Sequence, residues 1–273
     1  MAKKILLAGY YGFGNLGDDI LLETYLARLR PRFDVSVLLP GQPVDRWSPR
    51  AVVRAVANTD ILLFGGGGIF QDKTGSLGLA YYLSLILLAR LFGKRVVLLG
   101  QGIGPLSPFG LPLTRAVLRL AEKITVRDAA SLELLEGLSV SLSADSALLW
   151  EGLQGPAGRS PAAPPKKIVF IAREGPDLDD ALRLVRDLAE KSGAAVETLP
   201  FQPAVPRKTL ERLKEADLVV SMRLHGLILA AALGIPCIAA HDDPKILAWV
   251  AGSRDIAGLR ALAAADFEWL DSL

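Results

Sequence analysis

The chain has 273 residues, 51% of them hydrophobic, which is enough for one large domain or two of ordinary size. Its 31 basic and 29 acidic residues leave a formal charge of +2, and this balance argues against a surface dedicated to nucleic acid. Cys237 is the only cysteine, so no disulfide can form within the chain. We therefore expect a reducing, cytoplasmic location.

Two apolar segments bear on a possible membrane location. The run near the N-terminus is shorter than the apolar region of a signal peptide, and we interpret it as a first buried strand. The segment 77–92 is shorter than a membrane span and contains Arg90. A buried helix is the preferred interpretation of this segment, with a helix at a membrane interface as the alternative. At most, we expect peripheral association with the inner face of a membrane.

Strand-like and helix-like segments alternate along the first half of the chain. The expected strands are short, nearly continuous apolar runs at 3–9, 33–40, 60–68, 94–102, 123–128 and 141–149. The expected helices lie at 18–30, 48–59, 77–92, 110–122 and 129–137. In the second of these, Ser48 is the expected N-cap and Pro49 the first helical residue. This alternation predicts a parallel sheet with helices on both faces.

The alternation stops in a segment rich in Pro, Gly and Ala and then resumes. Expected strands follow at 167–175, 194–201, 217–222 and 236–243, with helices at 177–192, 206–215, 225–233, 245–252 and 258–271. The sequence thus predicts an α/β protein of two Rossmann-like domains, whose parallel sheets face each other across a cleft. The predicted ranges are 1–152 for the first domain, 153–166 for the linker and 167–273 for the second.

The first glycine-rich segment, GYYGFGNLGDD at 9–19, contains the spacing G-x-G-x-x-G of dinucleotide-binding loops. The second expected strand, however, lacks a terminal acidic residue for the ribose. Asp18 and Asp19 also stand at the helix start, where a pyrophosphate would bind. Two interpretations remain: a loop that faces a sugar through Asn15, Asp18 and the pair Tyr10–Tyr11, or a helix cap by Asp18 or Asp19 with a tight turn.

Three further segments follow expected strands. In FGGGGIFQD, Gly66 and Gly67 predict close approach of a ligand or of another chain segment, and Asp72 could reach a ligand. In GQGIGPLS, Gln101 is a second candidate, although such turns are ordinary loop chemistry. In TVRDAAS, Arg127 is either a site residue or a solvated or paired arginine beside a helix-capping aspartate.

The segment DLVVSMRLHGLILAAALGIP, 217–236, gives the most specific indication of a ligand site in the chain. Arg223 and His225 stand at a turn from strand to helix, where a helix N-terminus favours an anion, so the segment predicts a phosphate or carboxylate site. The alternative for His225 is capping or packing. Arg173 and Lys245 also follow expected strands and could converge on the same anion, or be ordinary surface charges. His241 is a weaker candidate, and the histidine spacing does not indicate a metal site.

With these segments in order along nearly the whole chain, the sequence resembles the polysaccharide pyruvyl transferase family, the CsaB-like enzymes of bacterial cell-wall polymers. The resemblance implies a GT-B-like fold and transfer of pyruvate from phosphoenolpyruvate to a sugar as a ketal. The typical acceptor would be N-acetylmannosamine in a secondary cell-wall polymer, of the kind that anchors surface-layer proteins. Phosphoenolpyruvate would be a co-substrate, and no other cofactor and no metal are expected.

The resemblance also implies roles for individual residues. Arg223 and His225 match the family's arginine and histidine at the donor site, and His225 would be the general acid. Arg173 and Arg127 match further donor-site arginines, and we add Lys245 and Gly226 as expected donor contacts. The expected acceptor contacts are Tyr11, Asn15, Asp18, Gly66, Gly67, Asp72 and Gln101. The expected partners are phosphoenolpyruvate and a glycan, which could be lipid-linked, but no nucleic acid.

Three other functions remain open at this point. A glycosyltransferase would use the same arginine and helix N-terminus for the diphosphate of a sugar nucleotide. A nicotinamide-dependent oxidoreductase is weakened by the missing acidic residue. A non-catalytic sugar-binding protein would not need the intact RLH at 223–225.

Overall fold

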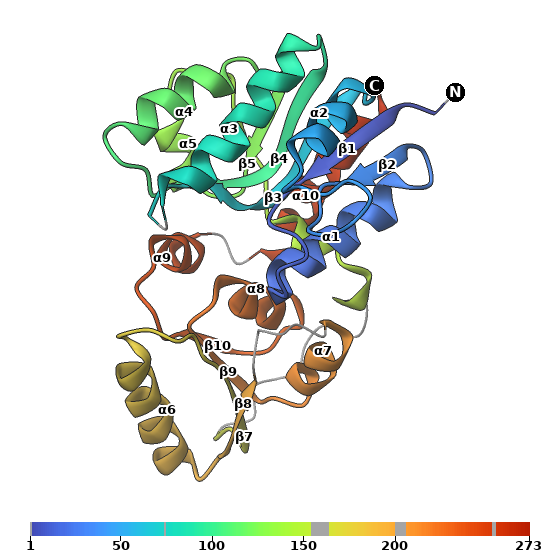
Figure 1. Ribbon diagram of the computed structural model, residues 1–273. Coiled ribbons are helices and arrows are strands. Elements are labelled where there is room, and N and C mark those ends of the chain that lie inside the picture. The colour runs from blue at the N-terminus through green and yellow to red at the C-terminus, as the bar shows by residue number, and fades with distance from the viewer. Residues whose placement is uncertain (1, 74, 154–163, 200–205, 253–254) are drawn as a thin grey trace. The chain divides into compact units, whose positions relative to one another are not determined.

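The computed structural model describes residues 2–273 except 74, 154–163, 200–205 and 253–254 (Figure 1). These residues form two compact units. Unit 1 comprises 1–13, 21–146 and 258–273, and unit 2 comprises 14–20 and 147–257. Most of the expected linker lies outside the described residues.

Unit 1 contains a six-stranded parallel sheet, which confirms the predicted class for this half. The order across the sheet is β2-β1-β3-β4-β5-β6. The strands are β1 (Lys4–Ala8), β2 (Asp34–Val37), β3 (Ile61–Phe70), β4 (Arg95–Ile103), β5 (Lys123–Val126) and β6 (Ser141–Leu142). β3 and β4 are buried along almost their whole length, because helices cover both faces of a parallel sheet.

The helices of unit 1 begin and end close to the expected residues. They are α1 (Leu16–Leu29), α2 (Pro49–Ala57), α3 (Ser76–Leu91), α4 (Gly110–Leu118), α5 (Ala129–Leu134) and α10 (Ile256–Asp271), of which α1 and α10 begin in unit 2. Ser48 caps α2, as expected, by accepting the Ala51 N–H at 3.3 Å. Asp128 caps α5 in the same way through the Ser131 N–H at 2.8 Å.

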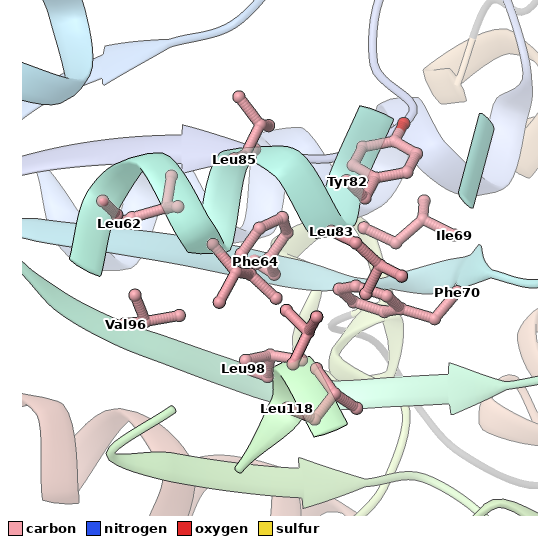
Figure 2. Close-up of a cluster of buried hydrophobic side chains, with 14 of the residues drawn as sticks. Leu62, Phe64, Ile69, Phe70, Tyr82, Leu83, Leu85, Val96, Leu98 and Leu118 are labelled. Carbon is pink, nitrogen blue, oxygen red and sulfur yellow. The ribbon is translucent and has the colours of Figure 1, made fainter. Parts of the chain in front are cut away.

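One extensive core cluster lies where α3 covers the sheet. Figure 2 shows Tyr82, Leu83 and Leu85 of α3 beside Phe64 and Leu98 of the central strands. These side chains are at most 4% exposed, so one face of the helix formed by the apolar segment 77–92 is buried, while the other face is exposed at Leu77 and Leu91. Within the part of the chain that the structure describes, no helix combines the length and hydropathy that crossing a membrane requires.

Two glycine runs form the ends of long strands, which extend one or two residues beyond the expected ranges 60–68 and 94–102. β3 continues through Gly65–Gly68, and β4 continues through Gly100 to Ile103. A Cβ atom on Gly65 would lie 2.5 Å from the Tyr11 hydroxyl oxygen, so a side chain there would collide with the core. Of the two expected explanations for this run, close approach of another chain segment is therefore the one observed at Gly65.

Unit 2 repeats the strand order of unit 1 on a smaller scale. Its parallel sheet has the order β10-β9-β7-β8. The strands are β7 (Lys167–Ile171), β8 (Ala195–Leu199), β9 (Leu218–Ser221) and β10 (Cys237–Ala239). The helices are α6 (Leu178–Ser192), α7 (Pro206–Lys214), α8 (Leu224–Ala232) and α9 (Pro244–Ala251). In each sheet the first strand lies between the second and the third, so the chain changes direction beside it.

The two units differ from the predicted ranges at α10 and at 14–20. α10 packs in unit 1, where the Phe267 ring lies 5.0 Å from that of Tyr25. Asp266 of the same helix accepts hydrogen bonds from Thr125 Oγ1 at 2.7 Å and from Ser143 Oγ at 2.8 Å. These contacts join the C-terminal helix to β5 and to the segment after β6, which the order of elements along the chain does not predict.

The burial of Asp266 leads to a testable prediction about pH. Burial raises the pKa of this carboxyl, and the hydrogen bonds from Thr125 and Ser143 oppose that effect. A raised pKa in the folded state means a stabilising contribution that is complete below the ordinary carboxyl pKa and is lost as the pH rises through the raised value. Each tenfold difference in proton affinity between the folded and unfolded states corresponds to about 1.4 kcal/mol. Asp266→Asn keeps an acceptor but cannot ionise.

We therefore expect the free energy of unfolding of Asp266→Asn, relative to wild type, to increase from pH 4 to pH 8. Asp266→Ala should cost about 1–3 kcal/mol, because it leaves two buried hydroxyls without their acceptor. Urea unfolding at a series of pH values measures both effects. A difference between Asp266→Asn and wild type that stayed constant with pH would contradict the raised pKa.

Candidate functional site

The carboxyl ends of β7 and β9 define the place in unit 2 where a ligand site is expected. These two strands are neighbours in the sheet, and the chain reverses its strand order beside β7. Open α/β sheets bind ligands outside the strand ends at such a position. Arg173 comes two residues after β7, and Arg223 comes two residues after β9. The topology therefore brings these two expected donor residues to one edge of the sheet.

The turn from β9 into α8 is held by a buried serine. Ser221 Oγ accepts the Arg223 N–H at 3.0 Å and donates to the Arg223 carbonyl at 2.8 Å. Gly226 lies in the first turn of α8, where a Cβ atom would come within 2.4 Å of Ser221 Oγ and 2.6 Å of Ile171 Cδ1. Its N–H already donates to the Arg223 carbonyl at 3.1 Å. The structure thus gives Gly226 a packing role in this turn, where a donor contact was expected.

The electrostatics of this edge favour an anion. Burial lowers the pKa of Arg223, and the neighbouring positive charge of Arg173 lowers it further, against the opposing effect of Asp18 and Glu174. Two guanidinium groups thus share one region beside the N-terminus of α8, where the helix dipole adds positive potential. A bound phosphate or carboxylate would offset the cost of holding these charges together.

A carboxylate from α9 holds Arg173. Asp243 caps α9 by accepting the Lys245 N–H at 3.1 Å, and its other oxygen lies 3.6 Å from Arg173 Nη1. Arg173 and the first turn of α9, with Lys245, therefore lie in one neighbourhood. Asp243 was not among the expected site residues, although an aspartate directly before a proline is a usual start of a helix.

The first glycine-rich segment also contributes to unit 2, through residues 14–20. Asn15 accepts the Gly17 N–H at 3.1 Å, so the residue that caps α1 is Asn15, whereas the cap interpretation names Asp18 or Asp19. A Cβ atom on Gly17 would lie only 1.9 Å from His225 Nδ1. Gly17 therefore lacks a side chain because the His225 ring lies against its backbone, which differs from the role of a glycine that admits a pyrophosphate. Asp18 is buried in the same segment.

Among the described residues, one group of side chains has the spacing of a metal site: Asp177, His241 and Asp242. His241 Nδ1 accepts the Asp243 N–H at 2.8 Å, so its lone pair is engaged. Nε2 of the same ring lies 3.1 Å from an Asp177 carboxylate oxygen, and two of the three side chains are strongly exposed. This geometry fits a hydrogen-bonded histidine better than a metal ligand.

Two expected acceptor contacts in unit 1 are core residues. Tyr11 is 1% exposed and its hydroxyl donates to the Gly65 carbonyl at 2.6 Å. Gln101 is fully buried and its Nε2 donates to the Phe64 carbonyl at 3.0 Å. Both side chains tie the strand ends of unit 1 together, because buried polar groups require hydrogen-bond partners. This arrangement corrects the expectation that Tyr11 and Gln101 present polar groups or a ring to a ligand.

Two further candidates in unit 1 are already paired. Asp72 accepts the Ser107 N–H at 2.8 Å and a hydrogen bond from the Ser107 hydroxyl at 2.5 Å, so it holds the segment after β4. Arg127 is almost fully buried and its Nη1 lies 2.6 Å from an Asp145 oxygen. The paired interpretation of Arg127 is therefore the observed geometry within unit 1.

Exposed aromatic side chains surround the loop after β1. Tyr10 stacks on Phe13 with ring centroids 4.3 Å apart, and Trp47 approaches Phe13 edge-on. Beneath them lies the buried guanidinium of Arg46, 5.1 Å from the Phe13 ring and 5.3 Å from the Trp47 ring. Tyr10 is 43% and Trp47 is 64% exposed, so these two rings, and not that of Tyr11, are accessible. We call Tyr10, Phe13 and Trp47 the aromatic patch.

The chain is similar to one known protein family over most of its length. The model of one protein family, polysaccharide pyruvyl transferase, matches residues 15–240, which include Arg173, Arg223 and His225 at the edge of the unit 2 sheet. No curated protein sequence matches the chain.

Several solved structures share the fold. UDP-GlcNAc 2-epimerase from Neisseria meningitidis, bound to UDP-GlcNAc, is 13% identical with a TM-score of 0.57, covering 98% of this chain and 92% of that one. The epimerase from Methanocaldococcus jannaschii is 12% identical with a TM-score of 0.57, covering 97% and 92%. An alpha-glucosyltransferase in complex with UDP and DNA is 10% identical with a TM-score of 0.53, covering 100% and 91%. These likenesses show an α/β fold of the GT-B type, as predicted.

The contact between Gly17 and His225 can be tested without knowledge of the ligand. The chain has two histidines, so its imidazole NMR spectrum contains two sets of ring signals. Gly17→Ala should shift the signals of His225, because the added Cβ would overlap Nδ1 and the ring must move. The His241 signals should stay unchanged. Gly78→Ala is the matched control, since a Cβ atom there has no neighbour within 4 Å. Unchanged His225 signals in Gly17→Ala would contradict the contact.

Proposed function

The chain belongs to the polysaccharide pyruvyl transferase family, and on that premise we propose that it transfers pyruvate from phosphoenolpyruvate to a sugar as a ketal. The observation that supports this most is the pair of guanidinium groups, Arg173 and Arg223, at the strand ends of unit 2 beside His225. This combination provides sites for a small polyanion together with a side chain that can carry a proton at neutral pH.

Phosphoenolpyruvate matches the charges of this edge. It carries a phosphate and a carboxylate, and the edge offers Arg173, Arg223 and the N-terminus of α8. Lys245, in the first turn of α9, adds a further positive charge near Arg173. In the proposed complex the phosphate and the carboxylate bind to Arg173, Arg223, Lys245 and the N-terminus of α8. The ligand then replaces part of the contact between Asp243 and Arg173.

His225 is the proposed general acid. Protonated, it donates its proton to the methylene carbon of the enol, and the adjacent carbon becomes the electrophile. One sugar hydroxyl adds to that carbon and loses its proton. The bond from the carbon to the phosphate oxygen then breaks, and a second hydroxyl of the same sugar closes the ketal. Of the two hydroxyl protons released, one replaces the proton that His225 donated and the other leaves with inorganic phosphate. Asp18, which lies in unit 2 with His225, is the proposed candidate for accepting a hydroxyl proton.

The aromatic patch of unit 1 supports a sugar acceptor. Flat rings such as Tyr10 and Trp47 contact the apolar face of a pyranose, and both rings are accessible. We propose a residue such as N-acetylmannosamine, within a cell-wall polymer that could be lipid-linked during modification in the cytoplasm. Phosphoenolpyruvate serves as co-substrate in this proposal, and the reaction needs no other cofactor and no metal.

A second candidate function is transfer of a sugar from a sugar nucleotide. It is favoured by solved structures of the same fold that hold UDP or UDP-GlcNAc. The same arginines and the helix N-terminus could hold a diphosphate. The two candidates differ in the ligand they require, so ligand binding separates them.

We expect phosphoenolpyruvate to raise the thermal unfolding midpoint in proportion to the logarithm of its concentration, because it binds only the folded state. Arg223→Gln should lose this increase, whereas Arg183→Gln should keep it, since Arg183 is an exposed arginine of α6. Differential scanning fluorimetry with phosphoenolpyruvate, UDP and UDP-GlcNAc measures this. An increase with the nucleotides and none with phosphoenolpyruvate would favour the glycosyltransferase.

His225→Ala should lower turnover by about 100- to 10,000-fold, the usual contribution of a general acid, while the unfolding midpoint stays near that of wild type. The matched control is His241→Ala, which removes the other histidine and should retain most turnover. Release of inorganic phosphate from phosphoenolpyruvate in the presence of an acceptor glycan measures the rate. Full activity of His225→Ala would refute its role as the acid.

A further inference from the structure

The outer face of α3 carries one charge, that of Arg90, and is otherwise mostly apolar. Five of its exposed residues form a stripe at spacings of three and four, namely Leu77, Ala80, Ser84, Leu87 and Leu91. Leu77 is 85% and Leu91 is 81% exposed. The opposite face of the same helix already packs on the sheet (Figure 2), so burial in the core does not account for these outward leucines.

The neighbouring helix α4 continues this surface. α3 and α4 contact each other within unit 1 (Figure 1). Phe109, directly before α4, is 89% exposed, and Leu113 and Leu120 are also exposed. Pro112 and Ala116 lie between them, again at helical spacing. We call the outward residues of α3 and α4, with Phe109 and Leu120, the α3–α4 face. Such a concentration of exposed apolar side chains marks a surface that contacts something other than water.

The charges of this region indicate what the face contacts. The sequence from Lys73 to Ala121 contains six basic residues and no aspartate or glutamate, although Asp72 and Glu122 bound it and Arg95 is paired with Glu122. Lys73, Arg90 and Arg119 are exposed beside the apolar stripe. Exposed leucine and phenylalanine side chains flanked by arginine and lysine are the combination with which proteins bind the surface of an anionic bilayer. A second copy of the chain would bring like charges face to face.

We propose that the α3–α4 face binds the surface of an anionic lipid bilayer. The apolar side chains, of which Phe109 and Leu77 are the most exposed, enter the interface between headgroups and acyl chains. Lys73, Arg90 and Arg119 pair with the lipid phosphates. This binding does not depend on the proposed reaction, and its test reads out membrane association alone.

The test is co-sedimentation of the full chain with vesicles of phosphatidylcholine, alone or mixed with phosphatidylglycerol. We expect the wild type to bind the mixed vesicles and to bind phosphatidylcholine weakly. Replacing Phe109 and Leu113 by Ser together should weaken binding by about tenfold. Leu182→Ser, at an exposed leucine of α6, is the matched control and should bind as wild type does. Both altered residues are exposed, so a matching unfolding midpoint verifies the fold.

A second pair of variants separates the charges from the apolar contacts. Arg90→Gln with Arg119→Gln should remove the preference for mixed vesicles, and salt should have the same effect on the wild type. Absence of binding to mixed vesicles, or binding that all these variants retain, would overturn the proposal. So would a dimer in sedimentation velocity that Phe109→Ser and Leu113→Ser dissociate, because the face would then be an interface between copies.

Discussion

The approach of His225 to the backbone of Gly17 constrains the whole candidate site. It requires a residue without a side chain in the first turn of α1, and it requires α8 to begin at Leu224 so that the imidazole lies against that turn. The start of α8 depends in turn on the two hydrogen bonds between Ser221 and Arg223 and on the absence of a side chain at Gly226. A single imidazole is thus positioned by contacts from two segments more than 200 residues apart in the chain.

The positive charges beside this imidazole are costly to hold together. Arg223 is partly buried, and the positive charge of Arg173 acts on it, so the free energy of both would fall when an anion binds. The protein compensates in part with carboxylates: Asp243 lies near Arg173, and Asp18 acts on Arg223. A ligand must compete with these carboxylates for the two arginines. The site therefore favours a small ligand with more than one negative charge, which can contact both guanidinium groups at once.

In unit 1, two polar residues that were expected to contact a ligand stabilise the core instead. Tyr11 and Gln101 bond to carbonyl groups of β3, and Gly65 makes room for the tyrosine hydroxyl. These contacts keep the long strands β3 and β4 in place beneath the loop that carries Tyr10 and Phe13. The exposed side chains of unit 1 that are available to bind a partner are therefore those of the aromatic patch and of the α3–α4 face. Both surfaces consist mainly of large apolar side chains.

The sequence alone was sufficient for most of the elements and for the class of fold, since apolar runs and helical spacing are local properties of the chain. An exception is the strand expected at 141–149, where β6 ends at Leu142 and Ser146–Leu149 form a 3-10 helix. It also placed Arg173 and Arg223 after strands and His225 in the first turn of a helix, because parallel strands deliver their carboxyl ends to one edge. Only the tertiary structure decided that Tyr10 is accessible and Tyr11 is buried, since adjacent loop residues have no periodicity that assigns them a face. It also decided that α10 packs in unit 1 and that residues 14–20 belong with unit 2. Those outcomes depend on contacts between distant segments, such as Asp266 with Thr125 and Gly17 with His225, which no local pattern encodes.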